Sequence, residues 1–363
     1  MFRPNDARYT VVGLVEVLQV TLSFGFLSKE ATPLFFSSGE YYNAFIITRF
    51  YPPHAHGDFT MKNTTLILCT TLLLPGAASL ADYQVEAQIG KGQLGQISQI
   101  AIGADDTLCV LEKNGKVSIF NPDGSLASTI DTGLQNTDAI ATAPSGKIHV
   151  FSTLTKTKKV KVGARMRTVH IPIGVECSVF DPSGKKLKTM KLDNLKSAKA
   201  ARIVGDKLVV ADLTARTLVL MDAETGEETG RIKKGLRLCC GIFDFCEAPD
   251  HTIAVSNLGA FRLQRFDLDG KLLLEFGKRG RGIDDFQGCC NPVSAAYLPD
   301  GRIVTVEKDP TRIKIYDANG KNAKQIKGVE ELVKGCEFIP VATDSKGNIY
   351  LANTKGHIVK LVP

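Results

Sequence analysis

The sequence predicts an all-β fold, a six-bladed β-propeller with four-stranded blades. Two series of polar tight turns alternate along the chain, which indicates four strands in each repeat. Two adjacent-cysteine pairs, Cys239-Cys240 and Cys289-Cys290, lie 50 residues apart, and each opens a segment with the same order of strand, turn, strand and turn. The offset between the pairs is therefore one structural repeat.

The first turn series follows strands that end in an aromatic residue or methionine. It comprises "FNPDGS" at 120, "FDPSGK" at 180, "MDAETGE" at 221, "FDLDGK" at 266 and "YDANGK" at 316. Asp or Asn opens each turn, and successive openings are 60, 41, 45 and 50 residues apart. This period fits propeller blades and excludes the usual helical solenoids.

The long first interval is explained by an insertion in the second blade, residues 154–173. It contains the basic stretch "TKTKKVKVGARMRTVH". One interpretation is a solvated hairpin whose charges protect an exposed edge, and the other is a contact for an acidic partner or an anionic surface. The basic residues are Lys156, Lys158, Lys159, Lys161, Arg165 and Arg167.

The two ends of the chain together supply the sixth blade. Residues 335–363 provide only three strands, whereas "DYQVEAQIGKG" near residue 82 resembles the fourth strand of another blade, "GKLLLEFGKRG". We therefore expect residues 82–90 to complete blade six and close the ring, which removes open sheet edges.

Residues 61–81 have the organisation of a secretory signal peptide. Lys62 precedes an apolar segment from Leu66 to Leu74, and small residues Ser79 and Ala81 mark a cleavage site. We expect residues 1–60 to be an upstream extension from a misplaced start, and residues 82–363 to be the exported propeller, periplasmic or extracellular. The alternative is a genuine extension with 61–81 as a membrane anchor, but its apolar segment is shorter than the roughly 20 residues that span a bilayer.

One segment resembles an NHL repeat, namely "FGKRGRGIDDFQGCCNPVSAAYLPDGRIVTVEKDPTRIKIYDANGK". It has the Gly-rich lead-in, the Pro before the inner strand, the PDG turn and the "RI-x-(I/V)-(F/Y)-D" strand. The chain is also similar to bacterial exported NHL-like proteins with "CCG" and "GCCNP" motifs. It departs from the pattern at Lys308-Asp309-Pro310, which replaces the usual Asn-His. The resemblance implies a binding platform and no particular reaction.

The cysteines form the main candidate site. Cys336 aligns with Cys240 and Cys290 at the entry to an innermost strand, so the sequence predicts that they gather at one mouth of the central channel. Three hypotheses remain open: disulfide staples, a thiolate site for copper or zinc, and a redox-active dithiol. The full candidate set is Cys239, Cys240, Cys246, Cys289, Cys290 and Cys336.

Polar residues end the second strand of five blades and form a second candidate set. Most such residues cap turns and face solvent, but a ring of carboxylate and amide oxygens is also how six-bladed lactonases hold a calcium-like ion. The residues are Glu112, Asp212, Asn257, Glu307 and Asn353.

The sequence therefore predicts a binding module with a cysteine-rich channel mouth, and no catalytic residue is identified. The expected ligand is a protein or small molecule at the propeller face, and the expected state is a monomer without a membrane span after signal cleavage. The net charge of +7 alone does not indicate nucleic acid, because no nucleic-acid-binding motif is present. The alternatives are a metal-dependent lactonase-like hydrolase and a disulfide-stapled interaction scaffold.

Overall fold

The computed structural model describes residues 31–38, 41–48, 83–163, 165–353 and 355–363. The chain divides into two compact units, Met1–Ala81 and Asp82–Pro363. In the first unit, β1 (Ala31–Ser38) pairs with β2 (Tyr41–Thr48) in an antiparallel ladder. The predicted signal peptide, residues 61–81, lies outside the described residues, so that assignment stays a prediction.

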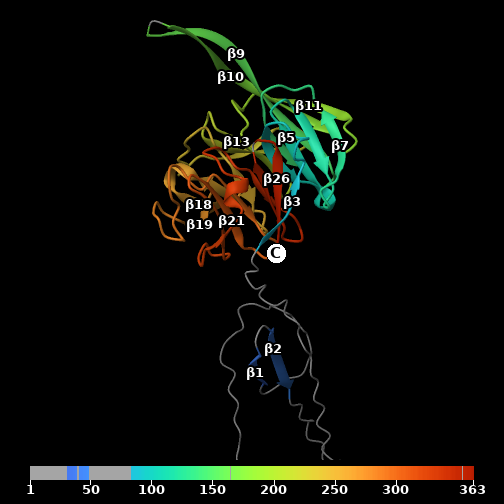
Figure 1. The fold of residues 1–363 in the computed structure, drawn as a ribbon. Coiled ribbons are helices and arrows are strands. Elements are labelled where there is room, and N and C mark those ends of the chain that lie inside the picture. Colours follow the sequence, from blue (N-terminus) through green and yellow to red (C-terminus); the bar gives the residue numbers. More distant parts are fainter. Residues whose placement is uncertain (1–30, 39–40, 49–82, 164, 354) are drawn as a thin grey trace, which may run out of the picture. The chain divides into compact units, whose positions relative to one another are not determined.

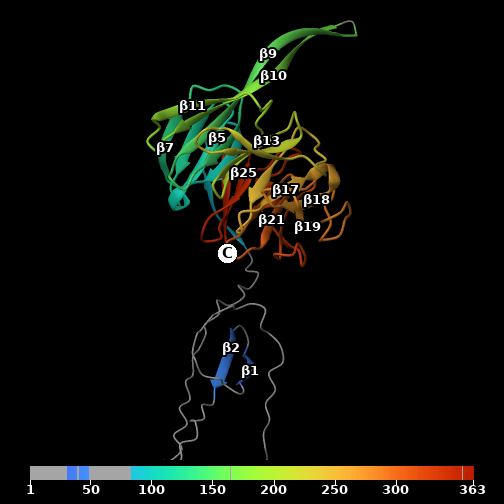
Figure 2. The ribbon, with the colours of Figure 1, turned by 180° about the vertical axis from the view of Figure 1, so that it is seen from behind.

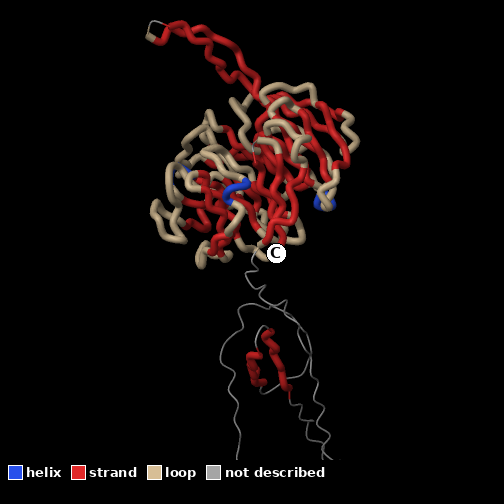
Figure 3. Tube along the Cα trace, viewed as in Figure 1, coloured by secondary structure: helices blue, strands red, loops and turns tan. Residues whose placement is uncertain are grey.

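The second unit is almost entirely β-structure and confirms the predicted fold class (Figure 3). Its described residues form six antiparallel sheets of four strands each (Figures 1 and 2). Blade one contains β4 (Ile97–Ile102), β5 (Leu108–Glu112), β6 (Lys116–Phe120) and β7 (Leu126–Asp131). Blade two contains β8 (Thr137–Thr142), β9 (Ile148–Val162), β10 (Arg165–Phe180) and β11 (Lys186–Leu192).

The remaining blades repeat this order from the inner to the outer strand. Blade three contains β12 (Ala201–Val204), β13 (Lys207–Asp212), β14 (Thr217–Asp222) and β15 (Glu228–Ile232). Blade four contains β16 (Phe245–Glu247), β17 (Ile253–Asn257), β18 (Arg262–Phe266) and β19 (Leu272–Phe276). Blade five contains β20 (Ser294–Tyr297), β21 (Ile303–Lys308), β22 (Thr311–Tyr316) and β23 (Lys324–Ile326). Blade six contains β24 (Val341–Thr343), β25 (Ile349–Asn353), β26 (His357–Val362) and β3 (Gln84–Ile89).

Burial follows the position of a strand in its blade. The second strands β5, β17 and β21 are buried at every position, because neighbouring blades cover both of their faces. The outer strands β7 and β11 expose most of their residues, since one face meets solvent. The core therefore lies between blades, as in the cluster that joins Phe151 and Val175 of blade two to Leu208 and Val219 of blade three.

The inner strands contact one another in a closed circuit. β4, β8, β12, β16, β20 and β24 meet in succession, and β24 also contacts β4. Ser345 and Asp106 hydrogen-bond across this last junction, at 2.9 Å from the backbone nitrogen and 2.7 Å from the hydroxyl group. The circuit places the entry loops of all blades around one axis.

The predicted turn series is confirmed by local hydrogen bonds. Oδ1 of Asp181 accepts backbone N–H groups of Ser183 and Lys185, and Asp317 repeats this arrangement with Asn319. These Asx turns satisfy backbone donors within four residues, so the chain reverses without help from the core. The hydrogen bond from Ser183 is also the main reason why the pKa of Asp181 lies below its usual value.

β3 pairs with β26 as the outer strand of blade six, in a register from Gln84 opposite Val362 to Ile89 opposite Ile358. Tyr83 donates a buried hydrogen bond to the carbonyl of Gly347 at 2.9 Å. That the ring depends on this strand stays a prediction.

Blade two carries the predicted insertion as a long hairpin. β9 and β10 stay paired from Ile148 opposite Phe180 out to Val162 opposite Arg165, and their outer half extends away from the propeller (Figures 1 and 2). In the described residues the helices are three short 3-10 turns, η1 (Ala104–Asp106), η2 (Leu258–Ala260) and η3 (Glu330–Leu332), and none of them has the length or hydropathy to cross a membrane.

We predict that removal of residues 82–90 destabilises the whole propeller, because it exposes the edge of β26 and removes buried Tyr83 and Ile89. A chain that begins at Lys91 should melt about 10 °C or more below one that begins at Asp82, since each kcal/mol lost lowers the midpoint by roughly 2–4 °C. Thermal unfolding followed by circular dichroism makes the comparison. Equal midpoints would show that the ring does not need this strand.

Candidate functional site

A tight turn presents the first cysteine pair at the entry to blade four. The backbone N–H of Ile242 donates to the carbonyl of Cys239 at 3.1 Å. The two residues between them, Cys240 and Gly241, have φ of 56° and 70°. Positive φ at both central positions is the pattern of a type I′ turn, which glycine adopts freely and cysteine does not.

The second pair lies in the loop that enters blade five, and its second cysteine is also left-handed. Cys290 has φ of 60° and is 8% exposed. The next residue, Asn291, is fully buried and donates to the carbonyl of Gln287 at 2.6 Å, while its Oδ1 accepts the backbone N–H of Lys308 at 3.0 Å. The asparagine therefore fixes the loop to the end of β21.

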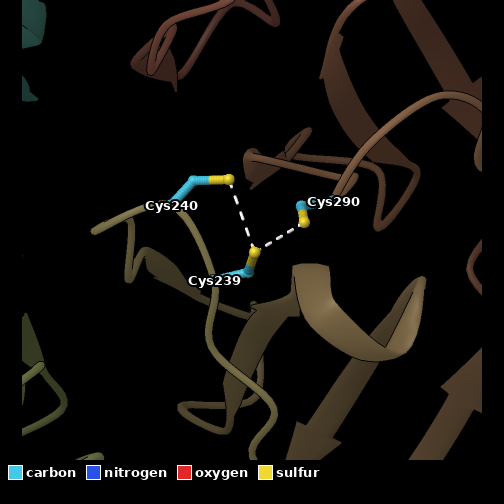
Figure 4. A group of neighbouring side chains, drawn as sticks. All are labelled: Cys239, Cys240 and Cys290. Atoms are coloured by element: carbon cyan, nitrogen blue, oxygen red, sulfur yellow. Dashed lines mark hydrogen bonds between the residues drawn. The ribbon is translucent and has the colours of Figure 1, made fainter.

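Three sulfur atoms from these two loops meet across the blade boundary (Figure 4). Sγ of Cys239 lies 3.4 Å from Sγ of Cys240 and 2.7 Å from Sγ of Cys290. The three sulfur atoms all lie within 4.8 Å of one another, and in the described part of the chain this is the one group of cysteine, histidine or carboxylate side chains close enough to share a metal ion. All eight described cysteines are free thiols, so the disulfides of the first hypothesis are not seen among them.

A buried lysine accompanies the sulfur group. Lys308 is 4% exposed, and its ammonium group interacts with the Cys240 thiol. The hydrogen bond from Cys239, helped by Lys308, holds the pKa of the Cys240 thiol below its usual value. Burial is the largest single influence on the pKa of Lys308 and lowers it, but the interactions with Cys240, Cys336 and Cys289 together outweigh burial and raise this pKa. Burial raises the pKa of Cys290.

The group opens into a cavity of about 340 Å³ at the channel mouth. Cys240, Lys308 and Cys336 all line it. Cys336 is therefore close, as the alignment predicts, but it is not one of the three mutually close sulfurs. Cys289 is the immediate neighbour of the group, with its Sγ 3.5 Å from that of Cys290.

Cys246 is not brought together with the other cysteines. The expectation of a shared face assumed a straight strand from Cys240, but the turn at Cys240 and Gly241 reverses the chain before β16 begins. Cys246 packs in the apolar cluster between blades four and five, where burial raises its pKa. Cys109 and Cys177 are core residues as expected, and burial raises the pKa of Cys109 to about 12.

The five polar residues at the second-strand ends bond to the loop that enters their own blade. In blade one, Oε2 of Glu112 accepts the N–H of Gly95 at 2.7 Å. Three other side chains also accept a backbone N–H: Asp212 from Lys196 (2.9 Å), Asn257 from Arg237 (2.7 Å) and Glu307 from Gln287 (2.6 Å). Asn353 instead donates, to the carbonyl of Leu332 (2.6 Å). Four of these side chains are buried and Asn353 is half-buried. They cap loops, as expected, but they do not face solvent, which the sequence analysis also expected.

Glu307 also anchors two buried cations. Arg312 donates to Oε2 at 2.7 Å, and Nζ of Lys314 lies 3.1 Å from Oε1. The side chains of Glu307 and Lys314 are fully buried, and this desolvation lowers the pKa of Lys314 to about 8. The ion pair therefore contributes to the structure of blade five and is not open to a ligand.

A second buried polar group lies on the inner strands, and the sequence analysis missed it. Asp244, just before β16, accepts from Gln99 of β4 at 3.3 Å and pairs with Arg202 of β12 at 3.4 Å. Its other carboxylate oxygen has no hydrogen-bond partner. Burial raises the pKa of Asp244 to about 6. The sequence did contain a signal for this buried residue, because Asp244 lies between Phe243 and Phe245 at the start of a predicted inner strand.

Lys308 was also missed as a member of the site. The signal for it was present, since Lys308-Asp309-Pro310 departs from the NHL pattern directly after Glu307. The six cations of the insertion, Lys156 to Arg167, lie on β9 and β10 and are not among the residues that line the mouth cavity.

Comparisons with known proteins support the fold alone. No protein-family model matches the chain, and a search of curated proteins found no match. Solved structures do match. A virginiamycin B lyase from Staphylococcus aureus, solved with quinupristin, shares 12% identity at a TM-score of 0.50, over 77% of this chain and 99% of the lyase. A protein of unknown function from Bacteroides thetaiotaomicron shares 12% identity at a TM-score of 0.54, over 92% of this chain and 98% of its own. The NHL resemblance stays a prediction.

We predict that Asp244→Asn changes the pH dependence of stability. With a pKa raised to about 6, Asp244 stabilises the fold below its unfolded pKa near 4, and this contribution is lost as pH rises through 6. The stability of the variant relative to the original protein should therefore rise by about 2 kcal/mol between pH 4 and pH 7. Urea unfolding at each pH measures it.

The prediction uses the difference in stability between the two proteins because His149 also titrates in this pH range. Burial lowers its pKa to about 4, so its own contribution is lost as pH falls below 6.5, in the opposite direction. The contribution of His149 is the same in both proteins, so it cancels when their stabilities are compared at the same pH. A difference that does not change with pH would mean that the pKa of Asp244 is not raised.

We also predict that Glu307→Gln is strongly destabilising. The glutamine can still accept the N–H of Gln287, but it leaves Arg312 and Lys314 without a counter-charge, which costs about 3–5 kcal/mol. The exposed Glu227→Gln is the control and should stay within about 0.5 kcal/mol. Denaturant unfolding of both variants tests this, and similar stabilities would contradict it.

Proposed function

We propose that the propeller is an exported binding module that holds a soft metal ion, copper(I) or zinc, at Cys239, Cys240 and Cys290. The observation that carries the proposal is the approach of three sulfur atoms from two blades to within 4.8 Å of one another. Thiolate donors select copper(I) and zinc over harder ions such as calcium or magnesium. The adjoining cavity leaves room for a ligand that arrives with the metal.

Backbone strain supports a role for these sulfurs. Cys240 and Cys290 both have positive φ, a conformation that costs a non-glycine residue on the order of 1–3 kcal/mol. Glycine and asparagine adopt this conformation more readily than cysteine does. Cysteine at both places is therefore better explained by its thiol group than by the turn.

The donor set favours copper(I) over zinc. Structural zinc almost always takes four ligands in a tetrahedron, whereas copper(I) is satisfied by fewer sulfurs. The three close thiols suffice for copper(I), and zinc would need a fourth ligand, for which Cys289 and Cys336 are the nearest candidates. Lys308 would offset part of the negative charge of the thiolates.

The other hypotheses have less support. A disulfide between Cys239 and Cys290 would be the oxidised form of the same group, since their sulfurs lie closest. The polar ring that a lactonase would use is engaged in capping bonds. The lyase among the solved neighbours shares too little identity to carry its activity over. A binding role agrees with the NHL resemblance.

We predict one bound copper(I) per chain after reconstitution of the reduced protein, measured by elemental analysis and by competition with a copper(I)-specific chelator. Cys290→Ser should remove most of the binding, and the double change with Cys239→Ser should remove little more, because ligands of one site are not additive. Cys289→Ser and Cys336→Ser report on a fourth ligand.

Cys246→Ala is the matched control, because it removes a thiol that packs in the core and leaves the group intact. It should bind as much copper as the original protein. Equal copper content in Cys246→Ala and Cys290→Ser, or no binding by the reduced original protein, would reject the site.

A further inference from the structure

We propose that the hairpin of residues 154–173, the outer half of β9 and β10, is a docking surface for an anionic lipid bilayer. This inference does not rest on the metal site. It concerns a separate element that projects from blade two, away from the propeller body (Figures 1 and 2).

The hairpin concentrates positive charge without compensation. It carries six lysine and arginine residues and no aspartate or glutamate. All six cations are exposed, and none of them takes part in an ion pair found among the described residues. Such a cluster repels itself, and an anionic surface that covers it would relieve this repulsion. The six cations of the hairpin are Lys156, Lys158, Lys159, Lys161, Arg165 and Arg167.

The register of the two strands combines charge and apolar surface on one face. Residues directly opposite each other in an antiparallel pair share a face, and so do the pairs two positions along. Three such pairs on one face each join a cation to an aliphatic side chain that is half-buried. The pairs are Lys156 with Ile171, Lys158 with Val169, and Arg167 with Val160.

This combination favours a bilayer over other polyanions. Aliphatic side chains gain from contact with the acyl boundary while neighbouring cations meet lipid phosphates, whereas a nucleic acid or an acidic peptide offers mainly charge to that face. The opposite face repeats the arrangement in one place, where Met166, 62% exposed, lies across from Lys161. A projecting hairpin also reaches a flat surface without a shaped partner.

The charge is sufficient for measurable binding. Each lysine or arginine near an anionic membrane surface raises the affinity roughly fivefold. If only half of the six cations reach the surface, removal of all six lowers the affinity on the order of 100-fold. The attraction is screened, so it should weaken as salt concentration rises.

The test is flotation of the full chain with phosphatidylcholine vesicles that contain or lack phosphatidylglycerol. The original protein should bind the anionic vesicles more tightly and lose binding at high salt. A variant with all six cations changed to glutamine should bind on the order of 100-fold more weakly. Val169→Thr with Ile171→Thr keeps every charge and should also weaken binding, which pure electrostatics would not.

A matched control removes the same charge from the propeller body. It changes to glutamine six exposed lysines for which the described part of the chain shows no ion pair: Lys186, Lys191, Lys233, Lys234, Lys324 and Lys327. This control should bind anionic vesicles like the original protein, and both variants should keep the original melting temperature. Equal loss in both variants, no preference for phosphatidylglycerol, or binding of polyglutamate or duplex DNA through the hairpin without vesicle binding would overturn the proposal.

Discussion

One hydrogen bond, repeated from blade to blade, positions the loops on which the mouth depends. In five of the six blades, the residue that ends the second strand reaches back to the backbone of the loop that enters the same blade, as Glu112 does with Gly95. In blade four Asn257 holds the loop before Cys239, and in blade five Glu307 holds the loop before Cys289. Because both anchors are fully buried, the bonds are protected from water, and the two cysteine loops keep a fixed separation.

The same bonds explain how a regular scaffold can hold an irregular site. Five blades cap their entry loop in this way, but only the loops of blades four and five combine the cap with paired cysteines. The caps secure the loops before the left-handed residues Cys240 and Cys290, so the strain at those residues is offset by structure that the fold requires in any case. Function is thus added at positions where the scaffold is already well held.

The fold was largely predictable from the sequence, because the alternating turns recur with a period that few architectures share. The candidate site was only partly predictable. Repeat alignment placed Cys240 and Cys290 at equivalent entries, but it could not show that the turn at Gly241 brings Cys239 into the group and separates Cys246 from it. Side-chain partners over long sequence separations, such as Asp244 with Gln99, leave no local pattern, so their meeting is visible only in three dimensions.

The buried contact between Asp244 and Gln99 also affects how a ligand can exchange. Both side chains are without exposed surface, and they lie between the residues that line the mouth cavity, among them Ser98 and Phe243, and those that line a second cavity of about 190 Å³, among them Ala101 and Cys246. This contact therefore separates the two cavities at its level of the axis. A ligand bound beside the cysteines would border the mouth cavity, so the groups that line this cavity, Lys308 and Cys336 among them, would affect its residence time.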